Sequence, residues 1–360
     1  MTVELAIYIA VAFIVMLVIL FSLVWATTHH PDTIQDEPVV SSSGAPTVKA
    51  GQVLKIMSWN VQYMAGKNYI FWYDLNDGSG PDERPSSADM ADTLSAVSTI
   101  IMDEDPDIIL LQEIDDGAKR TDDVDQLSDL LACLPKAYRC HASAFYWKAS
   151  FVPHPRIMGS VGMKLSTISK YRINEARRHQ LAVLPKDPIT RQFHLKRAIL
   201  ETRLPLTDGN QLVILNTHLE SLDQGTSVRQ RQVDQILSLL TQLSREGFTW
   251  VIGGDFNLVP SESAYRRLVE SEKRSYRPKT EISTIYQLYR GVPSLDQVNG
   301  SDYKKWFTHF SNKPFITKPD RTLDYIFISN NIQLGRHYVR QKDTFQISDH
   351  FPVVAEIRMP

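Results

Sequence analysis

The sequence of 360 residues predicts an α+β fold that follows one N-terminal transmembrane helix. Residues 5–25 form an apolar stretch without a charge, which is long enough to cross a bilayer as a helix. From residue 53 to the end, strand and helix patterns alternate, but many strands follow one another without an intervening helix. Such an order favours a mixed α+β arrangement over a doubly wound parallel sheet.

The N-terminal stretch is apolar on every face, whereas a helix of a soluble core needs only one apolar face. Tyr8 and Trp25 lie near its two ends, where amphipathic rings favour the membrane interface. A cleaved signal peptide is the alternative, because Val24 and Ala26 have the spacing of a cleavage site. No Lys or Arg precedes the stretch, and it exceeds a usual signal core. We therefore expect residues 1–27 to remain as a single-pass membrane anchor.

Residues 28–50 are predicted to form a flexible linker, because they contain three prolines and a Ser-Ser-Ser-Gly run but few large apolar side chains. Such a composition cannot bury a core. Acidic residues precede the first basic residue of this segment, Lys49. By the positive-inside rule, we expect the domain that follows to be non-cytoplasmic.

Residues 51–360 are predicted to form one domain, whose elements follow from the spacing of apolar residues. Helices are expected at residues 88–102, 124–134 and 227–243, and the last of these has Ser227 near its N-cap. Strands are expected at residues 53–61, 108–111, 160–164, 198–204, 211–217, 250–253, 323–328 and 353–357.

Charge and cysteine content narrow the classes of function. The net charge of −2 lacks the basic excess that usually supplies the affinity of a duplex-binding protein. Cys133 and Cys140 lie in no CxxC or Cys/His cluster, so we expect no zinc site. They either form a disulfide, if the domain lies outside the cytosol, or remain free thiols.

Six short segments place polar side chains directly against apolar strands, where a buried polar group needs a partner or a ligand. Each alone has an ordinary structural explanation, such as a turn cap or a satisfied core histidine, but together they suggest one site. The segments are Ser58-Trp59-Asn60, Leu111-Gln112-Glu113, Asn216-Thr217-His218-Leu219, Gly253-Gly254-Asp255-Phe256-Asn257, Leu323-Asp324-Tyr325 and Ser348-Asp349-His350.

These residue types are the ones that an enzyme uses to catalyse displacement at phosphorus. Glu113 and Asp349, together with an Asn, are hard oxygen ligands that suit Mg²⁺ or Mn²⁺. Asp255 and Asn257 alternate along one expected extended segment, so both side chains point the same way and can position a water. The inventory of metal, water-orienting carboxylate and donor groups suits in-line attack, and no GxSxG elbow or P-loop is present.

The order Asn, Glu, His, Asp-x-Asn, Asp, Asp-His over residues 53–358 resembles the endonuclease/exonuclease/phosphatase superfamily. The resemblance implies a DNase I-like four-layer sandwich, in which helices flank two packed mixed β-sheets and the site lies at one edge. It also implies that Asn60 and Glu113 bind the metal, with Asp349 nearby.

The same resemblance implies the catalytic roles. Asp255 and Asn257 would orient the nucleophilic water and the phosphate. His218 and His350 would stabilise the transition state and shuttle protons, and Asp324 would fix the tautomer of His350.

The Asn216–Leu219 segment narrows the choice among the branches of the superfamily. It resembles the corresponding segment of DNase I, sphingomyelinases and inositol phosphatases. Abasic-site endonucleases typically carry a Tyr-containing segment there. The stretch Trp306-Phe307-Thr308 is similar to the sphingomyelinase-like branch. Two further segments are either rims of a substrate site or ordinary packed loops. They are residues 68–74, which contain four aromatic rings, and residues 151–162, which contain His154 and Arg156.

The sequence therefore predicts a phosphodiesterase that depends on Mg²⁺ or Mn²⁺. A phospholipid or other small phosphodiester at a membrane is the favoured substrate, because the anchor keeps the site close to lipid. A nuclease is the alternative, and the absence of a basic excess disfavours it. A non-catalytic module is disfavoured because the whole set of site residues is present. We expect a monomer.

Overall fold

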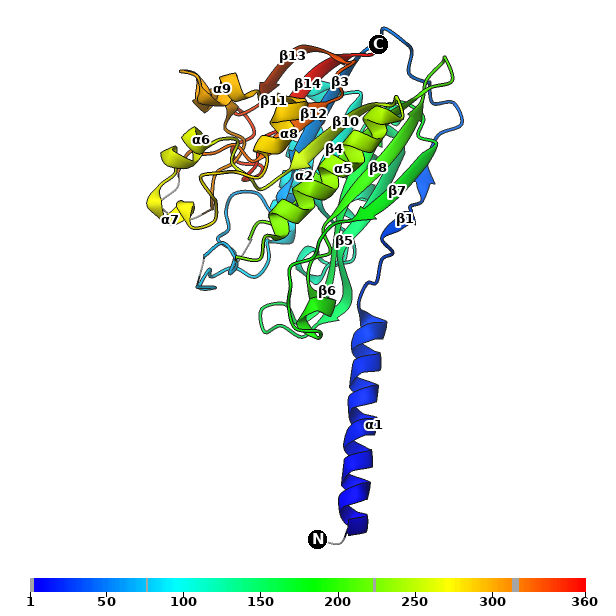
Figure 1. The fold of residues 1–360 in the computed structure, drawn as a ribbon, viewed down its shortest axis with the longest axis vertical. Helices are drawn as coiled ribbons and strands as arrows, with labels where there is room; N and C mark the ends of the chain where they lie inside the picture. Colours follow the sequence, from blue (N-terminus) through cyan, green and yellow to red (C-terminus); the bar gives the residue numbers. More distant parts are fainter. Residues whose placement is uncertain (1–2, 76, 223–224, 313–316) are drawn as a thin grey trace.

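The computed structural model describes residues 3–75, 77–222, 225–312 and 317–360 of the chain. Two β-sheets pack face to face, helices cover their outer faces, and one long helix projects from the domain (Figure 1). The predicted α+β sandwich with an N-terminal apolar helix is therefore confirmed.

The first sheet has the strand order β13-β14-β3-β4-β6-β5-β2 among the described residues. In that order the strands are Gln333–Val339, Val353–Arg358, Val53–Asn60, Ile108–Asp115, Gly159–Ser169, Cys140–Val152 and Val39–Val40. The second sheet has the order β1-β7-β8-β9-β10-β12-β11. Its strands are Ile34–Asp36, Glu175–Gln180, Ala198–Pro205, Gln211–His218, Thr249–Asp255, Asp324–Ile328 and Arg290–Val292.

Three amphipathic helices cover the sheets. Helices α2 (Ser87–Glu104) and α3 (Gln126–Cys133) pack on the first sheet, and α5 (Val228–Arg245) packs on the second. The side chains of a strand alternate between its two faces, so Leu54 and Ile56 of β3 enter the core between the sheets while Met57 and Trp59 face the helices. The shorter helices are α4 Thr190–Phe193, α6 Glu262–Arg267, α7 Glu270–Lys273, α8 Ser283–Leu288 and α9 Leu295–Asn299.

The predicted helices and strands of the domain are present, with ends that differ by a few residues. Strands β4 and β6 are longer than predicted, and β5, β7 and β13 were not delimited from the sequence. Ser227 occupies the N-cap of α5, but its side chain makes no capping hydrogen bond because its backbone is left-handed (φ 57°). Cys133 and Cys140 are free thiols.

The segment predicted as a flexible linker is packed along the domain instead of being free of it. Its strand β1 pairs with β7 of the second sheet, and β2 pairs with β5 of the first. Val48 is fully buried in the core between the sheets. An edge strand is held by backbone hydrogen bonds, which need no apolar pattern, and composition therefore did not reveal this pairing.

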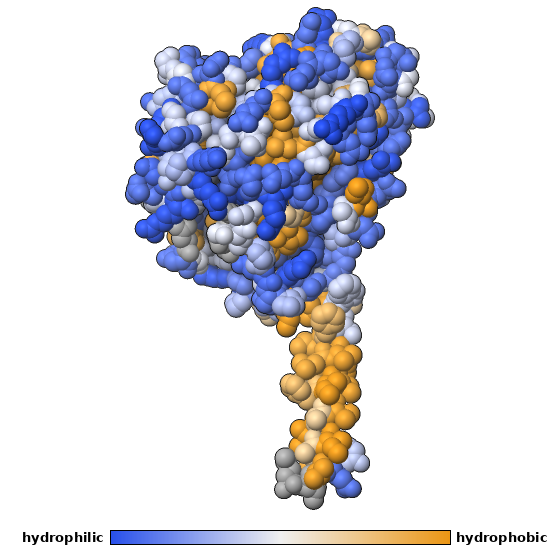
Figure 2. Space-filling model, viewed as in Figure 1, coloured by the Kyte–Doolittle hydropathy of each residue, from blue (hydrophilic) through white to orange (hydrophobic). Residues whose placement is uncertain are grey.

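Helix α1 (Val3–Thr27) stands outside the domain, and none of its residues is buried by the rest of the chain. Figure 2 shows it as an apolar column beside a largely hydrophilic domain. Its 25 residues correspond to a length of about 37 Å at the rise of an α-helix, enough to cross a bilayer. Length and composition suit a retained anchor and a signal sequence equally.

Candidate active site

The predicted site residues come together at one edge of the sandwich because of the strand directions. β3 runs parallel to β4, and β9 runs parallel to β10, so Asn60, His218 and Asp255 end their strands at the same edge. β12 is antiparallel to β10, which places its first residue, Asp324, opposite Asp255. β14 is antiparallel to β3, so the preceding His350 reaches the same edge.

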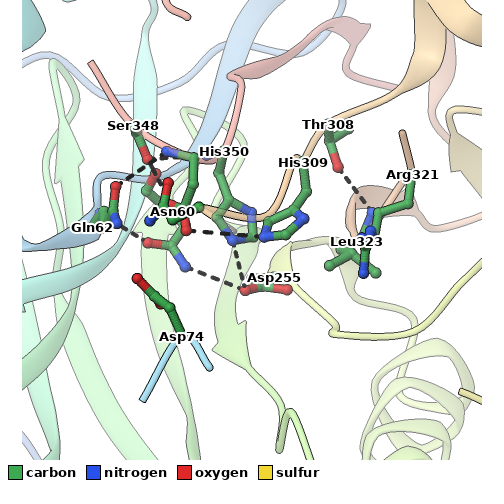
Figure 3. A network of polar contacts seen from close by, with 12 residues as sticks. Asn60, Gln62, Asp74, Asp255, Thr308, His309, Arg321, Leu323, Ser348 and His350 are labelled. Carbon is green, nitrogen blue, oxygen red and sulfur yellow. Dashed lines mark hydrogen bonds and ion pairs between the residues drawn. The ribbon is translucent and has the colours of Figure 1, made fainter. Parts of the chain in front are cut away.

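Asp255 is the centre of the cluster, and its Oδ2 faces three side chains, two of which, Asn60 and His350, are seen in Figure 3. The Nδ2 atom of Asn60 donates to it at 3.2 Å. The Nε2 atoms of His218 and His350 lie 3.3 Å and 3.5 Å from it. Burial raises the pKa of Asp255 to about 7, although the charge of His350 opposes this rise.

His350 is held in one orientation by its other ring nitrogen, which lies 2.8 Å from Oδ2 of Asp324. The hydroxyl of Thr308 accepts the backbone N–H groups of Leu323 and Asp324 at 2.9 Å and 3.0 Å, and so positions this carboxylate. Burial lowers the pKa of His350, but Asp324 and Asp255 outweigh that effect and raise it to about 10. The ring is therefore an imidazolium with Nε2 directed at Asp255.

His218 has the opposite electrostatic surroundings. Its ring is buried, and burial together with the charges of Arg197 and His350 holds its pKa well below the ordinary value. Its Nδ1 lies 3.3 Å from the hydroxyl of Tyr146. One histidine of the site is thus neutral and the other charged, an arrangement that suits proton transfer beside a stabilised negative charge.

Asn257 reaches Asp255 by a different route from the one predicted. Its backbone is left-handed (φ 51°), so the segment after β10 turns instead of continuing as an extended strand. The turn lets the backbone N–H of Asn257 donate to Oδ1 of Asp255 at 2.8 Å, while its amide lies 3.4 Å from Oδ2 and donates to the Leu219 carbonyl at 3.1 Å. The two residues are brought together, but the alternation argument for them is wrong.

Glu113 is directed into the site by an irregularity of β4. The register of β4 against β6 shifts between Leu111 and Ile114, and Glu113 in between has a left-handed backbone (φ 57°). Bulges of this kind re-aim a side chain. The Glu113 carboxylate accepts from Nδ2 of Asn60 at 3.0 Å, and its pKa is raised by burial and by the charge of Asp349.

The donor set fits a hard divalent cation. Glu113 and Asp349 repel each other, and a third carboxylate, Asp74, has its pKa raised to about 7 by burial and by Asp349. Carboxylate oxygens without a sulfur ligand suit Mg²⁺ or Mn²⁺. The Nδ2 atom of Asn60 faces Glu113, while its oxygen accepts from the backbone N–H of Gln62 at 3.0 Å, so its predicted ligand role requires that the amide turn its oxygen toward Glu113.

Two other groups of side chains could also hold a metal, since their ligand atoms lie within 4.8 Å of one another. These groups are His309 with Asp349 and His350, and Asp255 with Asp324 and His350. His309 was missed in the sequence, although it directly follows Trp306-Phe307-Thr308. Its ring lies 4.4 Å from that of His350, and its Nε2 lies 3.9 Å from Asp349.

A cleft of about 780 Å³ leads to this cluster. Glu113, His218, Asp255 and His350 line it, together with basic residues that include His154, Arg156 and the buried Arg197. Residues 68–74 are predicted to form either a substrate rim or a packed loop, and the structure shows some of them in each role. Phe71 is fully buried, whereas Trp72 stacks on His154 in the wall of the cleft, with ring centroids 4.7 Å apart.

Arg197 is a second residue that the sequence did not single out. Its side chain is 5% exposed and lines the cleft, and its Nε and Nη1 have no hydrogen-bond partner. Its guanidinium carbon lies 5.2 Å from the centre of the Tyr146 ring. A buried guanidinium without an anion is unfavourable, and its place in the cleft makes Arg197 a candidate to bind an anionic group of a substrate.

We therefore expect Arg197→Met to raise the free energy of unfolding of the ligand-free protein by about 1 kcal/mol and to lower kcat/KM by roughly tenfold. Thermal melts and steady-state kinetics measure the two effects. Arg203→Met is the control, because Arg203 pairs with Glu201 at 2.6 Å and its loss should destabilise the protein. If Arg197→Met destabilised the protein equally and left kcat/KM unchanged, Arg197 would have only a structural role.

Comparisons with known proteins agree with this geometry. A comparison with curated protein sequences finds no match. The chain is similar to the structure of an endonuclease/exonuclease/phosphatase from Beutenbergia cavernae, with a TM-score of 0.57 and 18% identity over 86% of this chain and 72% of that one. It is also similar to the human Nocturnin catalytic domain with bound sulfate, with a TM-score of 0.52 and 15% identity over 89% of this chain and 96% of that one.

A third similar structure, an endonuclease/exonuclease/phosphatase from Bacteroides vulgatus, has a TM-score of 0.51 and 16% identity over 86% of this chain and 100% of that one. At these identities the structures establish the fold. The profile of the Endonuclease/Exonuclease/phosphatase family matches residues 57–350, which include every predicted site residue. The chain therefore belongs to the endonuclease/exonuclease/phosphatase family, whose fold serves metal-dependent phosphoesterases and nucleases.

Proposed function

We propose that this protein is a phosphodiesterase that depends on Mg²⁺ or Mn²⁺ and acts on a phospholipid or another small phosphodiester at a membrane. The observation that carries the proposal is the convergence of Asp255, the neutral His218 and the charged His350 beside a cluster of carboxylates. These groups can orient a water for in-line attack on phosphorus and stabilise the charge that develops.

In the proposed mechanism, Asp255 orients the attacking water, and Asn257 holds that carboxylate through its backbone N–H. His350, fixed by Asp324, places positive charge where the phosphoryl oxygens become more negative. Neutral His218, whose Nε2 lies 3.3 Å from the Asp255 carboxylate, would donate a hydrogen bond to it and help to hold it in place. Glu113 and Asp349 would hold the divalent cation, with Asn60 and Asp74 beside them. When bound, the cation supplies Lewis-acid stabilisation of the phosphoryl group.

Two features support a membrane substrate over nucleic acid. The apolar helix α1, if retained, keeps the cleft near lipid. The net charge of −2 offers no general attraction to a polyanion. Basic residues in the cleft, including Lys119, Arg120 and Arg156, are the observation that favours a nuclease as the second candidate. We further propose a monomer, with the domain on the non-cytoplasmic side.

A substrate panel with the full-length protein in detergent micelles and Mn²⁺ tests the proposal. We expect hydrolysis of a chromogenic soluble phosphodiester and of at least one phospholipid among sphingomyelin, phosphatidylinositol and phosphatidylglycerol. Plasmid DNA should be nicked at least tenfold more slowly at physiological salt, where phosphate contacts are weakened. Efficient nicking without hydrolysis of any lipid would select the nuclease instead.

A further inference from the structure

The junction between α1 and the domain fixes which part of the domain lies next to the membrane. Thr28, which directly follows α1, pairs with Ala149 of β5 in an antiparallel bridge. The hydroxyl of Ser150 donates to the carbonyl of Thr27 at 3.4 Å, and the backbone N–H of His29 donates to the carbonyl of Lys148 at 3.2 Å. In an antiparallel pair, β5 continues past Ala149 in the direction from which the chain of α1 arrives. The end of β5 therefore approaches the membrane.

A second segment is tied to the same end of the domain. The ammonium group of Lys196 donates to the carbonyl of His29, and it also donates to the carbonyl of Gln192 at 3.0 Å. The indole of Trp147 in β5 donates to the carbonyl of Phe193 at 2.8 Å. Residues 187–196 are thus held against β5 near the end of α1, and Figure 1 shows the β5–β6 hairpin at the end of the domain from which α1 projects.

These two membrane-proximal segments form the mouth of the active-site cleft. Val152, Pro153 and Ile157 of the hairpin line the cleft, and Ile189 and Phe193 of the second segment also line it. The cleft therefore opens at the same end of the domain as α1, with its catalytic residues farther inside.

Four large apolar side chains lie in or directly beside the segments that line this mouth, and we name them the apolar rim. They are Phe151, Met158, Ile189 and Leu222, which are 42%, 52%, 57% and 48% exposed. Ile189 and Leu222 line the cleft, whereas Phe151 and Met158 adjoin the lining residues Val152 and Ile157 along the chain. Single exposed apolar residues are ordinary on a protein surface, but several around one opening indicate a surface that meets an apolar partner. Exposed Lys148 and Arg191 lie in the same two segments, where they can meet phosphate groups.

We infer that the apolar rim rests in the interface of the bilayer that α1 crosses, and that the cleft takes a phospholipid directly from the adjoining leaflet. The occupant of the rim is therefore a lipid surface. Apolar side chains bordered by basic ones are the usual composition of an interfacial membrane contact. The lipid-hydrolysing part of this inference rests on the proposed function, whereas the docking of the rim can be measured without any catalysis.

The docking is tested on the full-length protein, with Cys133→Ser, reconstituted in phosphatidylcholine vesicles that contain phosphatidylglycerol. A fluorescent label is attached through Met158→Cys or Ile189→Cys, and brominated lipids are added as contact quenchers. We expect quenching to remove at least half of the fluorescence at both rim positions. Val269 and Leu288 lie outside the rim and are 46% and 54% exposed. Labels placed through Val269→Cys and Leu288→Cys should keep their fluorescence. Rim labels that are quenched no more than these controls would overturn the inference.

Activity supplies the second measurement. The double variant Phe151→Ser/Met158→Ser, at two exposed rim residues outside the cleft lining, should hydrolyse vesicle phospholipid about tenfold more slowly and a soluble chromogenic diester at the wild-type rate. Val269→Ser/Leu288→Ser should match the wild type on both substrates. An unchanged rate of the rim variant on vesicles would contradict the inference. If no variant and no wild-type protein cleaved the soluble diester while the rim labels were quenched, docking would stand and the proposed function would fail.

Discussion

Replacement of His350 by Ala is expected to lower kcat on a soluble phosphodiester by roughly 10³-fold, within the range of about 10²–10⁴ that a positioned acid–base group contributes. The reason is its position between two carboxylates, with Nδ1 2.8 Å from Asp324 and Nε2 3.5 Å from Asp255. These carboxylates raise the pKa of His350 to about 10 and keep the ring charged at neutral pH. In the proposed mechanism, the variant loses the positive charge that stabilises the phosphoryl oxygens.

Because His350 is buried, its removal also leaves Asp324 without a partner, which is destabilising. His350→Gln serves as a second variant, since glutamine keeps much of the volume and can still donate to Asp324. We expect it to fold like the wild type and to remain roughly 10²-fold less active, because glutamine carries no charge and transfers no proton. His337→Ala is the matched control outside the cleft, where His337 contacts Gln297. Wild-type kcat in folded His350→Gln would refute the assigned role.

Removal of divalent metal is expected to abolish hydrolysis, and Mg²⁺ or Mn²⁺ should restore it. Glu113, Asp349 and Asp74 crowd negative charge into a buried site, and the pKa values of Glu113 and Asp74 are raised by burial and by Asp349. A divalent cation relieves this repulsion. Full activity in excess chelator would show that the site works without a metal.

Glu113→Gln separates metal binding from catalysis. It should weaken Mn²⁺ binding by about 100-fold, in line with the loss of a charged oxygen ligand. In chelator it should melt at a higher temperature than the wild type, because one repelling carboxylate is gone. Saturating Mn²⁺, which stabilises a protein by about 2.7 kcal/mol at 100 times its Kd, should raise the melting temperature of the wild type much more than that of the variant. Glu356→Gln, in β14, is the control and should behave like the wild type. Equal metal-induced shifts in wild type and Glu113→Gln would argue against Glu113 as a ligand.

Local patterns in the sequence determined much of the fold and the members of the candidate site. The apolar spacing of residues 227–243 predicts α5, and runs of apolar residues predict the central strands. Polar residues that directly adjoin such strands, among them Asn60, His218 and Asp255, are predictable because a buried polar group there needs a partner. The order of these residues along the chain sufficed to suggest the family.

The tertiary structure decided how these residues meet. The bulge that turns Glu113 into the site and the left-handed turn at Asn257 depend on strand register and backbone geometry, which side-chain periodicity does not encode. The same holds for β1 and β2, which are held by backbone pairing along sheet edges. In the sequence, Arg197 cannot be distinguished from other basic residues, and only the structure shows that it is buried near His218.

The apolar rim is likewise invisible in the sequence, because Phe151, Ile189 and Leu222 are far apart along the chain, and only the fold brings their segments to one cleft. Composition alone is consistent with either a substrate rim or a packed loop at residues 68–74, and the structure buries Phe71 among Tyr63, Tyr69 and Tyr73. The sequence thus determined which residues are suited to the chemistry and to a membrane-spanning helix. Only the packing of distant segments decided which apolar side chains are exposed beside the cleft, since exposure is a property of the whole fold and not of any one segment.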